Sequence, residues 1–236
     1  MRPENAPSVK PPPDRLYGRV RGHALRARQQ HLLAATLPRL AFRPEHAAAP
    51  LAAFGLGVRT VWLEVGAGSG EHAAAQAVAH PEAGVIACEV YANGICSLLA
   101  RLVPEGAEAT APLPANLRVW PDDARALLRA LPDASLERVF LLFPDPWPKA
   151  RHAKRRFVHP ALLPLLARVL RQGGEWRIAT DHPVYQEWVA EVMARQDWFA
   201  PAPPLTARPA AWPPTRYEAK ALSAGRTPRY WSFVRL

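Results

Sequence analysis

Five short apolar segments alternate with stretches of helical patterning between residues 61 and 180. Continuous apolar runs of this length are typical of parallel strands buried on both faces. A chain in which such strands alternate with helices folds as a doubly wound α/β sheet. We therefore predict parallel strands at five places: VWLEV (61–65), GVIACEV (84–90), NLRVW (116–120), 138–143 and EWRIAT (175–180).

The stretches between these segments carry helix signals. An Ala-rich helix is expected after the first strand, up to about His80, and a second one over residues 93–102. A short helix is expected to follow Asp123. Pro160 suits the first turn of a Leu-rich helix, and Gly173-Gly174 is expected to stop it.

The C-terminal part is predicted to close the sheet. Asp181 is expected to cap a helix whose apolar residues repeat at helical spacing. After a proline-rich loop (200–214), RYEAKAL (216–222) and PRYWSFVRL (228–236) are predicted to form a terminal pair of strands. The sheet would then be mostly parallel with an antiparallel C-terminal edge.

Length and composition predict one large domain with an N-terminal extension. A chain of 236 residues with 49% hydrophobic content can bury a sizeable core, which we place in residues 56–236. Residues 15–55 form an Arg-rich segment that is expected to be helical to about residue 40. Residues 1–14 contain five prolines and little apolar material, so a disordered tail is expected there.

Several kinds of site are not expected. Cys88 and Cys96 suit a buried core, and the eight histidines form no cluster with metal-ligand spacing, so no metal is predicted. The sequence has no run of 18 apolar residues and no signal peptide. A cytoplasmic protein without membrane segments is therefore expected.

A glycine turn follows the first predicted strand and predicts a nucleotide site. Glu64 precedes Gly66, Gly68 and Gly70, whose spacing differs from that of the dinucleotide fingerprint. An acid at this position would repel phosphate but suits a ligand that carries an amino group. Glu89 stands where acids grip ribose hydroxyls, and Asp123 could accept from an adenine amine. These acids predict a pocket for S-adenosylmethionine.

Residues 143–156, FPDPWPKARHAKRR, place an acid beside a cationic run. Asp145 lies among three prolines at the end of the fourth predicted strand, where open α/β sheets bind ligands. Five cations follow it at 149–156, and seven arginines without any acid lie between residues 15 and 44. Because the net charge of +10 is concentrated in these two patches, they predict nucleic-acid binding. Each patch alone could also be a solvated face.

These motifs together resemble the bacterial tRNA (guanine-N7)-methyltransferases. The resemblance is carried by the 143–156 block, the 64–70 turn, the ATD at 179–181 and residues 215–218, and it spans roughly residues 55–236. It implies a Rossmann-like class I methyltransferase fold and a guanosine in the tRNA variable loop as the target. Ala67 and Ser69 depart from the family pattern, which has bulkier residues in the turn.

The resemblance also implies roles for individual residues. Asp145 would be the catalytic acid, and Lys149 and Asp181 would hold the substrate together with Thr215, Arg216, Tyr217 and Glu218. The methyl donor would be contacted by Glu64, Gly66, Gly68, Gly70, Glu89, Asp123 and Asp145. The RNA would be contacted by Arg151, His152, Lys154, Arg155 and Arg156.

The expected chemistry needs few groups. Guanine N7 has a lone pair at neutral pH, so no general base is required, and Asp145 could stabilise the charge that grows on the ring. Asp181 and Glu218 could accept from the guanine N1–H and 2-amino groups. Trp147 could stack on a base or pack the loop onto the sheet.

Two other functions fit parts of the sequence. A methyltransferase for another nucleic-acid base could carry a similar Asp-Pro-aromatic motif, but enzymes of that type have no counterpart to the cationic run. A non-catalytic RNA-binding protein on the same fold would have no need for the acids of the pocket.

Overall fold

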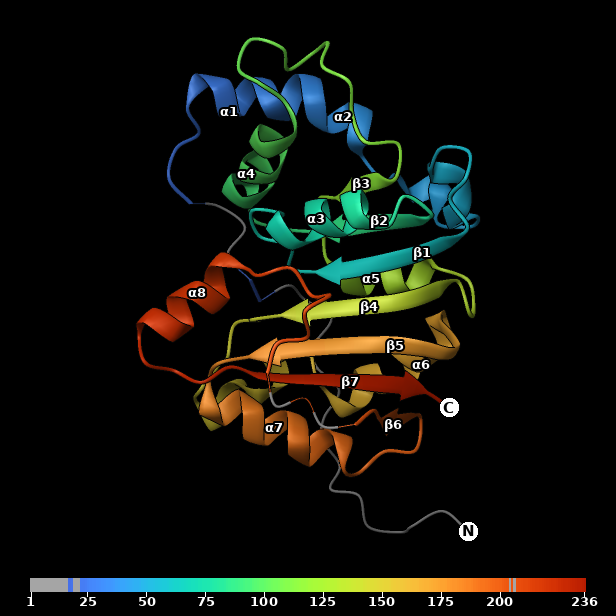
Figure 1. Ribbon diagram of the computed structural model, residues 1–236, viewed down its shortest axis with the longest axis vertical. Helices are drawn as coiled ribbons and strands as arrows, with labels where there is room; N and C mark the ends of the chain where they lie inside the picture. The colour runs from blue at the N-terminus through green and yellow to red at the C-terminus, as the bar shows by residue number, and fades with distance from the viewer. Residues whose placement is uncertain (1–16, 19–21, 204, 206) are drawn as a thin grey trace.

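The computed structural model describes residues 17–18, 22–203, 205 and 207–236. Its described strands form one seven-stranded sheet in the order β3-β2-β1-β4-β5-β7-β6 (Figure 1). Strands β1 to β5 are parallel, whereas β7 is antiparallel to both β5 and β6. The predicted fold class is thereby confirmed. The strands are β1 (Thr60–Val65), β2 (Ala83–Cys88), β3 (Leu117–Trp120), β4 (Leu136–Leu142), β5 (Leu170–Thr180), β6 (Phe199–Pro201) and β7 (Arg229–Arg235).

Helices cover both faces of the sheet (Figure 1). They are α1 (Ala27–His31), α2 (Leu37–Leu40), α3 (Glu71–Ala79), α4 (Ala92–Leu102), α5 (Ala124–Ala130), α6 (Leu163–Val169), α7 (Pro183–Met193) and α8 (Arg216–Ser223). A π-helical turn, Leu32–Thr36, joins α1 to α2. Short 3-10 helices occupy Pro44–His46, Pro50–Ala53, Ala150–Arg155 and Pro160–Leu162. None of the helices in the described part of the chain is long and apolar enough to cross a bilayer.

Two hydrophobic cores lie on opposite faces of the sheet. Helices α5, α6 and α7 pack against the face that carries Leu63 and Val139. Helices α3 and α4 and the N-terminal helical segment pack against the face that carries Trp62 and Val85. The central strands are thus buried on both sides, which explains their unbroken apolar sequences. The carboxyl ends of β1 to β5 consequently meet at one edge, where the glycine turn, Glu89 and the Asp145 loop all begin.

The predicted terminal pair of strands is wrong in its first member. Residues 216–222 lie in helix α8, and β7 instead pairs with β6, which follows α7. The Thr215 side chain accepts a hydrogen bond from the Glu218 amide (3.1 Å), which is the usual way to start a helix after Thr. Helix α8 therefore stands at the edge of the sheet to which the strands point (Figure 1).

Three further boundaries differ from the predictions. The Arg-rich segment becomes helical only at Ala27, because the extended Arg26 caps the helix and its amide donates to the Gln29 side chain (2.9 Å). The helix after Pro160 ends at Val169, before Gly173-Gly174, since β5 already begins at Leu170. Asp181 does not cap α7, whose N-cap is His182. The expected disordered tail, residues 1–14, lies outside the described residues.

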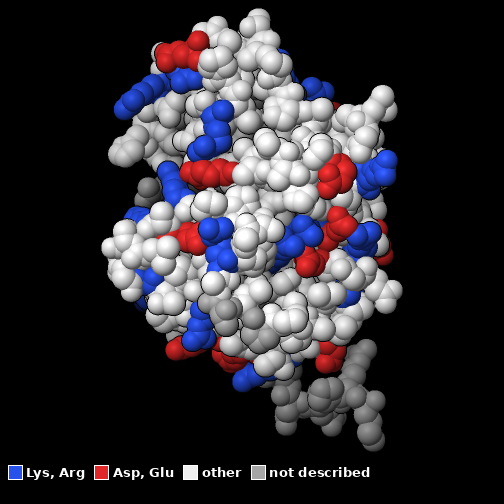
Figure 2. Space-filling model, in the orientation of Figure 1, with Lys and Arg blue, Asp and Glu red and all other residues white. Residues whose placement is uncertain are grey.

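The segment before α8 packs against β5 and β7 through Trp212. Trp212 packs with Ala179 and Tyr230, and the Arg177 guanidinium lies 5.3 Å from the Trp212 ring. On the face drawn in Figure 2, acidic and basic groups are interspersed. This segment anchors α8 at the edge where the strand ends meet.

Candidate active site

The glycine turn between β1 and α3 has a backbone that only glycine adopts easily. Gly66, Gly68 and Gly70 have φ angles of 72°, 56° and 72°, in the left-handed region. A Cβ on Gly70 would also lie 2.4 Å from the Leu98 side chain of α4. The turn is therefore packed tightly against α4 and leaves room for a ligand at its open side.

Glu89 is held by three backbone amides at the end of β2. Its Oε2 accepts from the Gly68 amide (2.6 Å), and its Oε1 accepts from the Val90 and Tyr91 amides (both 2.8 Å). Burial raises the pKa of Glu89, and the three backbone hydrogen bonds oppose that rise. Each carboxylate oxygen has a second lone pair that can accept from a ribose hydroxyl. The structure thus joins Glu89 and the glycine turn into one rigid unit.

Asp123 is bound by its own helix. It caps α5 by accepting from the Arg125 amide (2.9 Å), and the Arg125 guanidinium grips both carboxylate oxygens, with Nη2 to Oδ2 at 2.6 Å. Asp123 still lines the cavity beside Glu89. Its contact with an adenine amine stays a prediction.

Glu64 lies beneath the turn. Its Oε2 is 2.9 Å from Nδ1 of His72, and the other nitrogen of that ring is 3.2 Å from the Gln76 amide. Both Glu64 and His72 are buried. Val65 and Gly66 line the cavities beside the turn, whereas Glu64 is not among the lining residues. The predicted contact of Glu64 with the donor stays a prediction.

Two adjoining cavities open at the carboxyl ends of the strands. The first is bounded by the acids that follow β2 and β3, and the second by the glycine turn, the Asp145 loop and the start of α8. Both are lined by Gly18, Val65, Gly66, Glu89, Val90, Trp147, Arg155 and Phe157. Acidic groups, apolar walls and exposed glycine backbone suit a cationic nucleoside donor. The residues present therefore fit S-adenosylmethionine.

The Asp145 loop is strained and presents a free carboxylate. Phe143 and Trp147 have φ angles of 51° and 43°, which are unusual for residues with side chains and occur where the surroundings impose them. The Phe143 amide donates to the Ala179 carbonyl (2.7 Å), which ties the loop to the end of β5. Asp145 is exposed to the second cavity, and within the described part of the chain no group pairs with its carboxylate.

The predicted RNA-binding cations occupy different environments. Lys149, Arg151 and Lys154 are exposed, and His152 is half-buried. Desolvation and, after it, the neighbouring cations lower the pKa of His152. Arg155 lies 4.8 Å from the Trp147 ring and 5.1 Å from the Tyr17 ring, which places it at the mouth of both cavities.

Arg156 departs from its expected place on the RNA surface. It is buried, and its guanidinium donates to the carbonyls of Pro146 (Nε, 3.2 Å) and Trp147 (Nη2, 3.0 Å). Trp147 packs against Arg155 and His152 rather than projecting alone. The cationic run therefore has a part that faces outward and a part that holds the loop.

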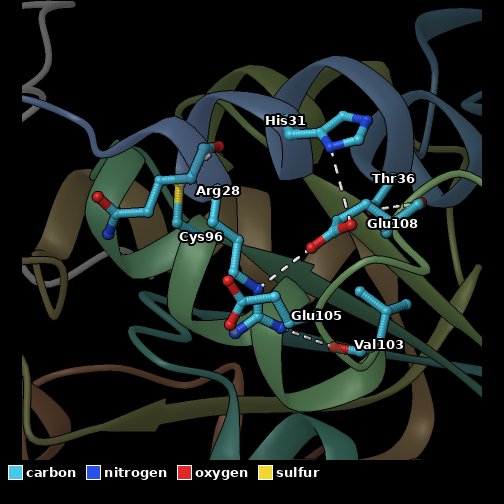
Figure 3. A network of polar contacts seen from close by, with 8 residues as sticks. Arg28, His31, Thr36, Cys96, Val103, Glu105 and Glu108 are labelled. Atoms are coloured by element: carbon cyan, nitrogen blue, oxygen red, sulfur yellow. Dashed lines mark hydrogen bonds and ion pairs between the residues drawn. The ribbon is translucent and has the colours of Figure 1, made fainter.

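Some arginines of the N-terminal segment bind the protein itself (Figure 3). Arg28 donates to the buried Glu108 carboxylate (3.2 Å) and to the Val103 carbonyl (3.0 Å), and His31 lies 3.7 Å from the same carboxylate. Arg39 donates to the Ala111 carbonyl (2.7 Å). These contacts dock the N-terminal helices beside α4, and a role of this segment in RNA binding stays a prediction. Arg15, Arg19 and Arg21 lie outside the described residues.

The predicted substrate residues are only partly brought to the cavity. Arg216 and Tyr217 line it, and the Tyr217 ring would lie 3.6 Å from a Cβ on Gly68. Glu218 instead points inward, where its Oε1 accepts from Tyr230 (2.7 Å) and Arg208 (2.9 Å). Asp181 is paired with Arg226 at 2.5 Å. Thr215 caps α8, as described above.

Several lining residues were not predicted. Val90 and Tyr91 directly follow Glu89, and their place at a strand end is a signal that could have identified them. Arg125, two residues after Asp123, and Tyr17, in the Arg-rich N-terminal segment, also line the cavity. Among the described residues, no group of three or more His, Cys, Asp or Glu side chains could hold a metal ion.

The strand order, the antiparallel β7 and the acids at the strand ends define a class I S-adenosylmethionine-dependent methyltransferase. The family model described as "Putative methyltransferase" matches residues 58–229. The chain is 62% identical to a tRNA (guanine-N(7)-)-methyltransferase of Granulibacter bethesdensis, with 97% of this chain and 98% of the relative covered. It is 46% identical to one of Paramagnetospirillum magneticum, with 98% and 95% covered. The chain belongs to the tRNA (guanine-N7)-methyltransferase family.

Solved structures of other methyltransferases share the fold. A 16S rRNA methyltransferase, KamB, superposes with a TM-score of 0.53 at 19% identity and covers 76% of this chain and 90% of its own. A variant of the 16S rRNA (adenine(1408)-N(1))-methyltransferase of Catenulisporales acidiphilia gives 0.51 at 18% identity, with 83% and 92% covered. At this identity the likeness shows the fold alone.

Proposed function

We propose that this chain transfers a methyl group from S-adenosylmethionine to N7 of a guanosine in the variable loop of tRNA. The observation that carries the proposal is the free Asp145 carboxylate, which shares one cavity with Glu89 and the glycine turn and lies four residues before Lys149. Family membership supports the same activity, since the relatives are named for it. Residues 56–236 would form the methyltransferase domain.

The donor would be held at the carboxyl ends of β1, β2 and β3. Glu89 would accept from the ribose hydroxyls, Asp123 from the adenine amine, and the backbone of Gly66 and Gly68 would allow close approach. The donor supplies a methyl group made electrophilic by its sulfonium. We keep Glu64 as a residue that acts on the donor through the turn, because its carboxylate is engaged by His72.

Transfer requires alignment more than proton chemistry. The N7 lone pair forms the new carbon–nitrogen bond as the sulfur–methyl bond breaks, and the positive charge passes from the sulfur to the guanine ring. A fixed carboxylate beside the ring stabilises that charge, and we assign this role to Asp145. No proton has to leave N7 before attack, so the reaction needs no general base.

The guanosine would be held in the second cavity, next to the donor. Arg216 and Tyr217 line this cavity, and Lys149 is exposed four residues after Asp145. Asp181 can accept from the guanine edge if it exchanges its partner Arg226, whose side chain is exposed. Glu218 would act mainly by fixing α8, since Arg208 and Tyr230 already occupy its Oε1.

The function is tested by incubating the protein with labelled donor and unmodified tRNA transcripts. We expect label on N7 of a guanosine in the variable loop, located by cleavage at the modified base and by mass spectrometry of nuclease fragments. A transcript whose variable-loop guanosines are replaced by adenosines should take up no label. Label on another base would reassign the target, and tRNA binding without label would make the protein a non-catalytic binder.

The exposed cations are expected to contact phosphates. Arg151→Ala and Lys154→Ala should each weaken tRNA binding and reduce the slope of log K against log salt by about 1, because each removes one phosphate contact. Filter binding across a range of salt concentrations measures both quantities. Arg195→Ala, which removes an exposed arginine beyond α7, is the matched control. An unchanged slope in both variants would exclude these residues from the interface.

A further inference from the structure

Arg156 sits directly behind the strained loop that carries Asp145. Its side chain is buried, with 5% of the residue exposed, although it closes a run of otherwise exposed or half-exposed cations. Its Nε and Nη2 donate to two consecutive carbonyls, those of Pro146 and Trp147. Lysine, with a single ammonium, cannot reproduce this planar fork. The guanidinium is thus a brace on the loop rather than a group held out to solvent.

The loop needs such a brace because its backbone makes few hydrogen bonds of its own among the described residues. Pro144, Pro146 and Pro148 have no amide to donate, so the loop cannot form a ladder of its own. Its ends are bent by the left-handed backbone of Phe143 and Trp147, which persists only under outside constraint. The Phe143 amide is bound to the Ala179 carbonyl on one side. Arg156 supplies the constraint on the other side.

Arg156 also connects the loop to α7. Its guanidinium lies 4.8 Å from the ring of Trp188, a helix residue whose Nε1 donates to the Val158 carbonyl (2.5 Å). The Val158 amide in turn lies 3.3 Å from the hydroxyl of the fully buried Tyr185. Two of the five N–H donors of the guanidinium bind carbonyls and its cation lies over an aromatic ring, and among the described residues no carboxylate forms an ion pair with it. The Arg156 guanidinium is therefore held in place by Trp188, which packs against the hydrophobic core.

We propose that Arg156 is a positioning residue for methyl transfer, which sets the place of the Asp145 carboxylate by clamping the Pro146 and Trp147 carbonyls onto α7. It acts through the loop and does not touch phosphate. This inference rests on the proposed function for its effect on activity, but its effect on the loop is independent of any reaction. A displacement of about 1 Å at a reacting group can cost about 100-fold in rate, which sets the size of the effect.

The kinetic test compares Arg156→Ala with Arg151→Ala. With donor and tRNA both saturating, Arg156→Ala should lower kcat by about 100-fold, with an unchanged slope of tRNA binding against salt. Arg151→Ala should weaken tRNA binding and lower the slope, and Arg195→Ala, the exposed control beyond α7, should change neither kcat nor the slope. Arg156→Lys keeps the positive charge and one donor nitrogen, so its kcat should lie between those of the parent and the alanine variant. An unaltered kcat, or a lower salt slope in Arg156→Ala, would overturn the proposal.

A second measurement separates this proposal from the proposed function. Hydrogen exchange of the Phe143 amide, followed in a peptide that begins at least two residues before Phe143, should be faster in Arg156→Ala and Arg156→Lys than in the parent, because a loosened loop holds this amide less firmly against the Ala179 carbonyl. A peptide from β2 should exchange as in the parent, which shows that the fold is intact. Unchanged exchange in the loop overturns the brace even if activity falls, and faster exchange supports it even if the target is not tRNA. If Arg156→Ala does not fold, Arg156→Lys carries both tests.

Discussion

Asp145→Ala should reduce methyl transfer by about 100- to 1,000-fold while the protein still binds tRNA. The magnitude is that of removing one fixed group that stabilises charge in a transition state. Asp145 is exposed, and no described group pairs with it, so its loss leaves no buried partner unsatisfied and should not disturb the fold. Single-turnover transfer at saturating donor measures the rate, and filter binding measures the affinity for tRNA.

Asp145→Asn refines this experiment. The amide has nearly the same shape as the carboxylate but carries no charge. A loss of transfer rate close to that of the alanine variant would therefore show that the negative charge of Asp145 is what the reaction requires. Asp197→Ala, at an exposed position beyond α7 and near the far edge of the sheet, is the matched control. A fully active Asp145→Ala protein would remove Asp145 from the reaction.

Glu89→Gln should weaken donor binding by about 10- to 100-fold. The carboxylate accepts hydrogen bonds from three backbone amides and has lone pairs left for ribose hydroxyls. A hydrogen bond to a charged group contributes about 1.5–3 kcal/mol to binding. Glutamine would also turn an amide donor toward backbone N–H groups. Calorimetric titration with S-adenosylmethionine measures the affinity, and the melting temperature should fall as well.

The control for Glu89 lies at the other end of the same strand. Glu82 is exposed just before β2 begins, far from the cavity, so Glu82→Gln should leave donor binding intact. Equal losses in both variants would mean that Glu89 acts only on stability. Retained affinity in Glu89→Gln would mean that the donor is gripped elsewhere in the cavity.

The strands and the glycine turn were predictable because their signals are local. A strand buried on both faces needs apolar residues at every position, and the sequence of β2 is buried throughout, as its pattern indicates. Gly66, Gly68 and Gly70 indicate a left-handed backbone conformation that residues with side chains rarely adopt. Glu89, Asp123 and Asp145 were placed correctly at strand ends, because the ends of parallel strands must share one edge.

Helix α8 was not predicted, because its local pattern is ambiguous. RYEAKAL alternates well enough for a strand, yet its helix is set by the Thr215 cap and by the inward anchor of Glu218 on Tyr230 and Arg208. Those partners come from a loop and from the last strand. The short β6, which takes the place at the sheet edge, has only three residues and no pattern of its own.

Arg155 and Arg156 show what the sequence determines and what only the tertiary structure decides. The sequence alone determines that an acid and a cationic run lie at the end of a buried strand, since these are facts of order and spacing. It does not distinguish two adjacent arginines of the same charge. Folding brings Tyr17 and Trp147 to Arg155 and brings Trp188 of α7 to Arg156. Both arginines line the first cavity, and only that packing buries Arg156 and directs its guanidinium to the loop carbonyls. The burial of a side chain depends on which distant residues pack against it, and the local sequence does not encode those residues.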